Sequence, residues 1–297
     1  MNKALSYFRA LRPNQWTKNA VVLAAFIFAL GDRHQSVSFS QLGAAVGAML
    51  TFCLISSGTY LLNDVRDVER DRLHPGKKFR PLAAGEISVK GSLLLAFVLM
   101  AAGLSGASLI APRLALVEAG YVLLQFVYIL WLKNIGLIEL FVIAAGFVLR
   151  AVAGAVTVDV VFSPWLLLCT LLLALFLALC KRRHEKVVID SPASETRPSL
   201  EKYSERLLDQ LIAIVSTATI VFYSLYTLWP DTIEKFGTAR LSLTIPFVMF
   251  GLFRYLDLVY RHDQGGRPEK ILLTDAPLIV DIMLYGLTVL AVIILHV

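Results

Sequence analysis

Asn63 to Pro81 reads NDVRDVERDRLHPGKKFRP, and the other features of the sequence are interpreted in relation to this stretch. It directly follows an apolar run and is the most charged segment of a hydrophobic chain. Read as a continuing helix, Asn63, Asp67 and Asp71 share one face because they lie four residues apart, with Asp64 beside them. Four oxygen-bearing side chains on one face would repel one another unless a cation lay between them. The pattern predicts a metal site.

Mg²⁺ is the metal that this pattern predicts, since proteins hold it through a few carboxylates together with the phosphate oxygens of a substrate. Lys77, Lys78 and Arg80 follow immediately and supply donors suited to phosphate. The alternative interpretation is a solvated charged loop whose basic residues help to set membrane topology. The regular spacing of four and the abrupt switch from acidic to basic residues favour a site for a phosphorylated substrate that arrives with its metal.

The remaining sequence is too apolar for a soluble domain. Of 297 residues, 57% are hydrophobic and 17% are charged, and the mean hydropathy is +0.70. Several apolar runs approach the roughly 20 residues that span a bilayer. The sequence therefore predicts an all-α integral membrane protein with nine spans, at roughly 16–31, 43–62, 91–110, 114–132, 135–157, 164–180, 207–229, 241–260 and 277–297.

Residues 1–297 are expected to form one polytopic membrane domain. Charged loops after the second and sixth spans divide it into two four-helix halves, about 16–132 and 135–260, followed by a last helix at about 277–297. With the N-terminus in the cytoplasm, 23 of the 28 lysines and arginines fall on the inside. The positive-inside rule then predicts a multi-pass protein of the cell (inner) membrane, with its C-terminus on the opposite side. The net charge of +6 suits anionic lipid and phosphate, and no nucleic-acid motif is present.

Further polar groups lie within or at the ends of the predicted spans. Arg150 is central in AAGFVLRAVAG, and Glu139 lies three helical turns earlier on the same face, about 16 Å away and too far to pair. We expect this face to line a cavity, with ligand contact and structural pairing both open for Arg150. Tyr128 and Lys133 end the fourth span, and KRRHE (181–185) ends the sixth at the same surface. The alternative interpretation is that KRRHE is a stop-transfer cluster of positive charge with no role in the site.

The motif NDVRDVERD resembles the first aspartate motif, NDxxDxxxD, of the UbiA superfamily of intramembrane prenyltransferases. Within that superfamily the chain is similar to the decaprenyl-phosphate phosphoribosyltransferase branch. The segments that carry this second resemblance are RPNQWTKN (12–19), DRLHPGKKFRPLAAG (71–85), YILWLKN (128–134), GFVLRAVAGA (146–155) and LCKRRHE (179–185). The resemblance implies nine helices around a central cavity that opens to the cytoplasmic side, with Mg²⁺ as the cofactor.

The implied reaction is transfer of 5-phosphoribosyl from 5-phosphoribosyl 1-diphosphate to a polyprenyl (decaprenyl-like) phosphate, releasing diphosphate. The branch points to precursors of arabinan-type cell-wall polymers. The expected partners are these two substrates and membrane lipid. Whether the protein forms a homo-oligomer is left open by the sequence. Ordinary superfamily members carry a second DxxxD after the sixth helix, where this chain has KRRHE. Cations suit direct phosphate binding better than carboxylates do, so this departure agrees with the branch.

The resemblance assigns roles residue by residue. It implies Mg²⁺ ligands at Asn63, Asp64, Asp67 and Asp71, and catalytic roles for Asp64, Asp67, Asp71 and Lys181. We expect substrate-binding roles for Lys18, Asn63, Lys77, Arg80, Tyr128, Lys133, Glu139, Arg150, Arg182 and Glu185, with structural pairing still open for Arg150. Two other functions stay open: an aromatic prenyltransferase that uses a prenyl diphosphate with a quinone or haem precursor, and a non-enzymatic carrier of polyprenyl phosphates.

Overall fold

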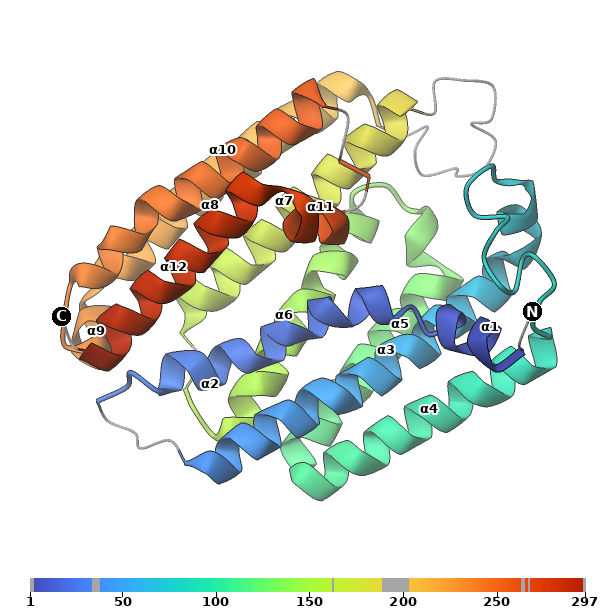
Figure 1. Cartoon of the computed structure of the whole chain (residues 1–297), viewed down its shortest axis with the longest axis horizontal. Coiled ribbons are helices and arrows are strands. Elements are labelled where there is room, and N and C mark those ends of the chain that lie inside the picture. Colours follow the sequence, from blue (N-terminus) through green and yellow to red (C-terminus); the bar gives the residue numbers. More distant parts are fainter. Residues whose placement is uncertain are drawn as a thin grey trace.

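The computed structural model of the protein describes residues 3–33, 38–161, 163–188, 203–262, 265–266 and 268–295, and every regular element in these ranges is a helix (Figure 1). The elements are α1 (Lys3–Ala10), η1 (Pro13–Leu23), α2 (Ala24–Ala29), α3 (Phe39–Leu73), α4 (Val89–Ile110), α5 (Pro112–Leu130), η2 (Leu132–Asn134), α6 (Ile138–Val158), α7 (Pro164–Val188), α8 (Glu205–Leu228), α9 (Pro230–Phe236), η5 (Arg240–Thr244), α10 (Ile245–Arg261), α11 (Pro268–Thr274) and α12 (Ala276–Leu295). Most of the predicted loop after the sixth span, residues 189–202, lies outside the described residues.

Eight helical segments of the described chain are long and apolar enough to cross a membrane: α3 to α8, η5 continued by α10, and α12. They correspond to eight of the nine predicted spans, so the prediction of an all-α, multi-pass membrane protein is confirmed. The first predicted span, 16–31, is different because an 11-residue 3₁₀-helix, η1, continues into the six-residue α2. At about 2.0 Å and 1.5 Å per residue these cover about 31 Å, close to the thickness of the hydrocarbon core. The predicted count of nine transmembrane helices is therefore not confirmed exactly: the described chain has eight such helical segments, and this composite segment lies at the remaining predicted span, 16–31.

The motif NDVRDVERD lies on an uninterrupted helix. α3 has 35 residues and begins at a capping box formed by Ser38 and Gln41. At 1.5 Å per residue it is about 52 Å long, whereas a bilayer core is about 30 Å thick. Asn63 to Asp71 therefore lie on the last turns of a helix that continues past the apolar run, as the spacing predicted.

α6 is the element on which both sides of the molecule pack. With η1, α3, α4 and α5 it forms one apolar core that includes Phe52, Tyr121 and Ala153. With α7, α8, α10 and α12 it forms another, which includes Leu140, Phe176 and Leu208. Figure 1 shows α3 beside α4 and α7 beside α8, with the η1–α2 segment between the two groups. The division into two four-helix halves stays a prediction, because α6 belongs to both cores.

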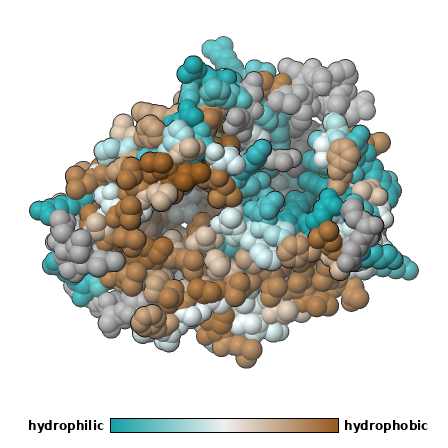
Figure 2. All heavy atoms as spheres, viewed as in Figure 1, coloured by the Kyte–Doolittle hydropathy of each residue, from teal (hydrophilic) through white to brown (hydrophobic). Residues whose placement is uncertain are grey.

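Polar and apolar side chains separate on the face shown in Figure 2. Hydrophilic side chains gather over α11, the start of η1 and the segment that follows α3, whereas hydrophobic side chains cover α12. The face is hollowed between α12 and the η1–α2 segment. The charged ends of α3 and its neighbours therefore lie together at one end of an otherwise apolar bundle.

Asp275 fixes the start of α12. Its Oδ1 accepts a hydrogen bond from the Leu278 N–H at 3.1 Å, and Arg254 donates to both carboxylate oxygens, at 3.1 and 2.8 Å. The hydrogen bonds from Arg254 hold the pKa of Asp275 below its ordinary value. The stabilisation is therefore fully present above pH about 4, the ordinary aspartate pKa, and is lost as the pH falls further.

Asp275→Asn is expected to lower the melting temperature of the detergent-solubilised protein at neutral pH, because the substitution removes the charge that Arg254 and the helix N-terminus stabilise. The difference from the unsubstituted protein is expected to narrow as the pH falls below about 4. Melting curves across about pH 2.5–7 would check this, with the exposed Asp159→Asn as the control. A difference that stays constant with pH would contradict the assigned role.

Candidate active site

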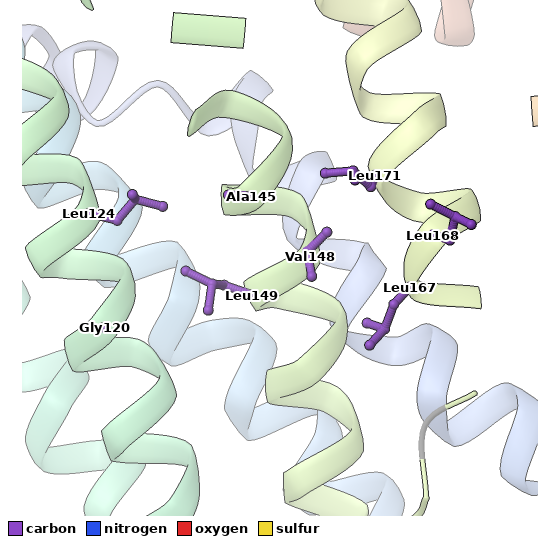
Figure 3. A pocket seen from close by; sticks show the side chains of 8 residues that line it. All are labelled: Gly120, Leu124, Ala145, Val148, Leu149, Leu167, Leu168 and Leu171. Atoms are coloured by element: carbon purple, nitrogen blue, oxygen red, sulfur yellow. The ribbon is translucent and has the colours of Figure 1, made fainter. Parts of the chain in front are cut away.

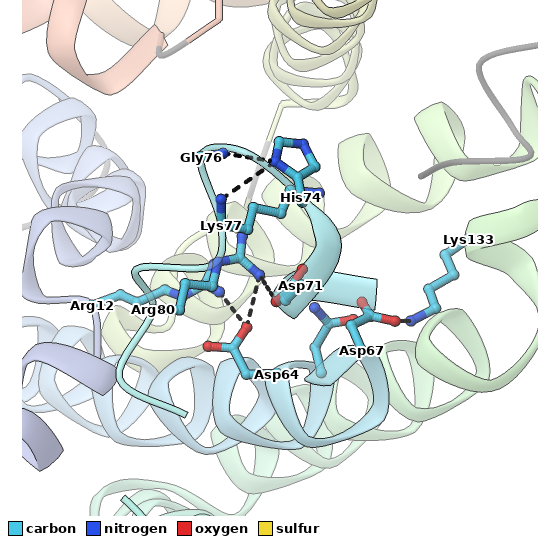
Figure 4. A network of polar contacts seen from close by, with 10 residues as sticks. Arg12, Asp64, Asp67, Asp71, His74, Gly76, Lys77, Arg80 and Lys133 are labelled. Carbon is cyan, nitrogen blue, oxygen red and sulfur yellow. Dashed lines mark hydrogen bonds and ion pairs between the residues drawn. The ribbon is translucent and has the colours of Figure 1, made fainter. Parts of the chain in front are cut away.

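Three aspartates and three basic side chains form one acidic–basic network at the end of α3 (Figure 4). The aspartates are Asp64, Asp67 and Asp71, all on α3. Their partners come from three other places in the chain: Arg12 from the residue before η1, Arg80 from the turn after α3, and Lys133 from η2. The network thus joins the end of α3 to the start of η1, to the turn after α3 and to η2.

Two positions in this network are occupied by basic nitrogens that lie between oxygens of α3. Arg80 Nη1 donates to Asp64 Oδ1 at 3.1 Å and to Asp71 Oδ2 at 2.5 Å. Lys133 Nζ donates to Asp67 Oδ1 at 2.5 Å and to Asn63 Oδ1 at 3.4 Å. Positive charge therefore does lie among these oxygens, as their mutual repulsion requires, and here the protein's own side chains provide it.

Asp64 and Asp71 are the most enclosed members of the network, each with a side chain that is 5% exposed. Asp64 also accepts a hydrogen bond from Arg12, so two guanidinium groups share one carboxylate. Arg12 lies over the ring of Tyr60, one helical turn before Asp64. Because an enclosed carboxylate is stable as an anion only when paired, Asp64 depends on both arginines.

The turn after α3 brings its basic residues back over the motif. His74 Nδ1 accepts hydrogen bonds from the backbone N–H groups of Gly76, at 3.1 Å, and Lys77, at 3.3 Å. Gly85, with φ +75°, closes the following turns in a conformation that suits glycine. This folding lets Arg80 reach an aspartate nine positions earlier, and it holds Lys77 beside the same network (Figure 4).

The oxygen donors fit Mg²⁺, although the described residues contain no complete metal cage. No three His, Cys, Asp or Glu side chains in the described ranges converge closely enough for one. Mg²⁺ does not require that, because it commonly keeps waters and uses one or two carboxylates with substrate phosphates. Asp64 and Asp71 contact the same Arg80 nitrogen, so their oxygens already face one cation position. The donor set is therefore suited to the metal.

Glu139, Arg182 and Glu185 form a second cluster, which is buried. Arg182 donates to both Glu139 oxygens, at 2.7 and 3.0 Å, and also to Glu185. The Tyr203 hydroxyl lies 3.5 Å from Glu139 and accepts the N–H of Leu137, a residue with φ +62° at the start of α6. Arg182 is thus occupied by two carboxylates. Its contact with substrate stays a prediction, and so do those of Glu139 and Glu185.

Arg150 faces the protein interior, as its position in a span predicted. Its partners are the Asn19 side chain at 2.7 Å, the Gly146 carbonyl at 2.7 Å and the Tyr121 hydroxyl at 3.0 Å. The rings of Phe52, Tyr121 and Phe147 lie 4.8 to 5.5 Å from the guanidinium carbon. This arrangement ties η1, α5 and α6 together, which supports the structural alternative without testing ligand contact.

The remaining predicted residues lie at the same end of the bundle. Lys18 is on η1 and Lys181 is on α7, and both lie near enough to Glu269 of α11 to lower the pKa of that carboxyl. Tyr128, near the end of α5, lies close to the charge of Arg182. The structure therefore separates the predicted site residues into the acidic–basic network, the buried cluster, the Arg150 contacts and two lysines whose charges act on Glu269 of α11.

Several polar residues in these groups were not among the predicted site residues: Arg12, Gln15, Asn19, Tyr121 and Tyr203. Glu269 was a weak candidate only. Arg12, Gln15 and Asn19 belong to RPNQWTKN (12–19), one of the segments that carry the family resemblance. That resemblance was the signal that could have identified them. Glu269 follows a Gly-Gly turn in a basic loop, a weaker signal. Tyr121 and Tyr203 have no sequence signal, because a tyrosine at the end or on the face of an apolar helix usually serves as packing.

An apolar pocket lies between α5, α6 and α7 (Figure 3). Its volume is about 620 Å³, and its lining residues are Gly120, Leu124, Ala145, Val148, Leu149, Leu167, Leu168 and Leu171. No lining side chain carries a polar atom, so the pocket suits a hydrocarbon chain and offers nothing to a phosphate.

These features define a multi-pass membrane protein in which an apolar helical bundle holds clustered carboxylates and basic groups at one end. The model of the UbiA prenyltransferase family matches residues 20–270, and the chain belongs to this family. The resemblance seen in the sequence is thereby confirmed.

Curated relatives match over nearly the full chain. The decaprenyl-phosphate phosphoribosyltransferase of Mycolicibacterium smegmatis is 35% identical over 92% of this chain and 88% of its own. The proteins of the same name from Mycobacterium tuberculosis and Corynebacterium glutamicum are 36% and 34% identical, over 92% of this chain and 89% and 82% of theirs.

A solved UbiA homologue from Archaeoglobus fulgidus, bound to GPP and Mg²⁺, superposes with a TM-score of 0.73. It is 23% identical, and the match covers 97% of this chain and 99% of the other. At this identity the likeness establishes the UbiA fold and nothing about the ligand of this chain.

Proposed function

We propose that this protein transfers 5-phosphoribosyl from 5-phosphoribosyl 1-diphosphate to a polyprenyl phosphate and releases diphosphate. The observation that carries the proposal is the acidic–basic network, in which oxygen donors for a metal alternate with basic donors for phosphate. The 34–36% identity to proteins named decaprenyl-phosphate phosphoribosyltransferase supports the same reaction.

Asn63, Asp64, Asp67 and Asp71 would hold Mg²⁺, for which their oxygens are suited. The metal would neutralise charge on the departing diphosphate. Arg12, Arg80 and Lys133 already lie within hydrogen-bonding distance of the aspartates, so a phosphate group that reaches the network competes for the same donors. These three side chains would bind and orient the donor's phosphates.

The acceptor needs no strong general base, because the phosphate of a polyprenyl phosphate is anionic at neutral pH. Its oxygen forms a bond to C1 of the ribose while the bond from C1 to the diphosphate oxygen breaks, and the diphosphate leaves with the electron pair. The protein's task is to align the acceptor opposite the leaving group and to stabilise the developing charge. Lys18, Lys77 and Lys181, at the same end of the bundle, are suited to the acceptor phosphate and the ribose 5-phosphate.

The polyprenyl tail would lie against apolar helices, with its phosphate at the network. The hollow between α12 and the η1–α2 segment (Figure 2) and the apolar surfaces beside it would provide its path into the bilayer. The charge asymmetry of the loops supports a cell (inner) membrane location with the network on the cytoplasmic side.

A radiolabel transfer assay on the purified protein in lipid tests the function. The donor is 5-phosphoribosyl 1-diphosphate labelled in the ribose, the acceptor is a polyprenyl phosphate, and each reaction is run with Mg²⁺ and with EDTA. Label is expected to enter the organic phase only with the metal. A folded preparation that transfers no label, yet joins a prenyl diphosphate to an aromatic acceptor, would replace the proposal with the aromatic prenyltransferase alternative. Metal-independent binding of polyprenyl phosphate without turnover would favour a carrier.

A further inference from the structure

α11 carries one carboxylate, that of Glu269, which belongs neither to the acidic–basic network nor to the buried cluster. Glu269 lies in the first turn of this short helix, and its Oε1 accepts a hydrogen bond from Gln15 Nε2 of η1 at 2.8 Å. Its other oxygen, Oε2, is shielded from solvent and has no hydrogen-bond partner among the described residues. A buried carboxylate oxygen without a donor is costly, which indicates that a donor is missing there.

The Gly265–Gly266 turn seats α11 against the end of α7. A Cβ at Gly265 would come within 3.0 Å of the Cys180 carbonyl and of His184, and one at Gly266 within 2.6 Å of the His184 ring. The close approach requires glycine at both positions, so α11 is held against the KRRHE segment. Glu269 thereby lies between η1 on one side and α7 on the other.

Two lysines flank this carboxylate, Lys18 of η1 and Lys181 of α7. Burial would raise the pKa of Glu269, but the charge of Lys18, the hydrogen bonds from its own backbone N–H and from Gln15, and the charge of Lys181 outweigh it and lower the pKa. Glu269 is therefore an anion at neutral pH, and it can only accept hydrogen bonds. Glu269 is thus a hydrogen-bond acceptor on whose charge one lysine of η1 and one lysine of α7 both act.

This arrangement matches the chemistry of the reacting ribose, which would lie between its own 5-phosphate and the phosphate of the acceptor. The phosphates require cations, whereas the hydroxyl groups between them are neutral donors that a carboxylate accepts well. The aspartates of the network are engaged by Arg12, Arg80 and Lys133, so they are less suited to this task. We propose that Glu269 binds the ribose hydroxyl groups of the donor and sets the preference for a ribosyl over a deoxyribosyl donor. This inference rests on the proposed phosphoribosyl transfer.

The test compares 5-phosphoribosyl 1-diphosphate with its 2-deoxy and 3-deoxy analogues in the lipid-phase transfer assay. The unsubstituted protein is expected to prefer the ribosyl donor by about 10- to 100-fold in kcat/KM over at least one analogue, the range for a hydrogen bond to a charged group. In Glu269→Gln this preference is expected to fall to within about 3-fold, with a higher KM for the ribosyl donor and an unchanged KM for polyprenyl phosphate. Glu269→Asp, which keeps the charge, is expected to restore part of the preference.

Lys270→Gln serves as the matched control, because Lys270 is the exposed next residue on the same helix. An active Glu269→Gln protein with undiminished discrimination would overturn the inference, as would a rise in the KM for the acceptor alone. If Glu269→Gln does not fold, full discrimination in Glu269→Asp, whose shorter side chain withdraws the oxygen, would overturn it equally. Failure of the unsubstituted protein to transfer any label is a different result and would refute the proposed function itself.

Discussion

Asp64→Asn is expected to lower the rate of phosphoribosyl transfer by about 10³-fold, the largest effect of any single substitution in the network. Asp64 is enclosed and is shared by Arg12 and Arg80, and it is one of the oxygen donors that would hold Mg²⁺. Asparagine keeps the shape but removes the charge, so both arginines lose their anionic partner and the metal loses a carboxylate. Initial rates in the radiolabel assay, measured across a range of Mg²⁺ concentrations, would check this.

Two comparisons make the result specific. Asp159→Asn removes a carboxylate whose ion pair with Arg113 is exposed and remote from the network, so it is expected to leave the rate unchanged. The melting temperature of Asp64→Asn shows whether the loss comes from unfolding. A folded Asp64→Asn protein that retains more than about a tenth of the activity would remove Asp64 from the proposed metal site.

Glu139→Leu is expected to destabilise the protein by about 3–5 kcal/mol, the usual cost of removing one partner from a buried ion pair. Both side chains are nearly inaccessible, with exposures of 4% for Arg182 and 1% for Glu139. The substitution leaves the guanidinium with Glu185 alone and also removes an acceptor for Tyr203. Thermal unfolding followed by loss of the monodisperse peak in size-exclusion chromatography would report the change.

The double substitution Glu139→Leu with Arg182→Met is expected to recover most of that stability, because it removes both buried charges together. Glu69→Leu is the control, since Glu69 pairs with Arg72 on an exposed surface where such pairs contribute about 0–1 kcal/mol. A stable double variant with normal transfer would assign Arg182 to structure alone. A stable but inactive one would support the predicted contact with substrate. Destabilisation of the double variant beyond that of Glu139→Leu would contradict the pairing argument.

The sequence by itself determined the helical membrane class, the family and the face of α3 that carries the oxygens. These properties depend on hydropathy over about 20 residues and on a spacing of four, both of which act locally along one chain segment. The 3₁₀ form of η1 was not predictable in this way, because the composition of a short segment is the same whichever helix it adopts.

Only the tertiary structure decided which charges meet. Arg12 reaches Asp64 across 52 positions of sequence, and Gln15 reaches Glu269 across 254. The tertiary structure also gives two neighbouring residues of KRRHE different partners. Arg182 donates to the buried Glu139, whereas Lys181 lies near Glu269. The physical reason is that a charge in an apolar bundle must find a partner wherever packing brings one, and adjacent residues on one helix point to different neighbours. Local sequence signals contain no information about that choice.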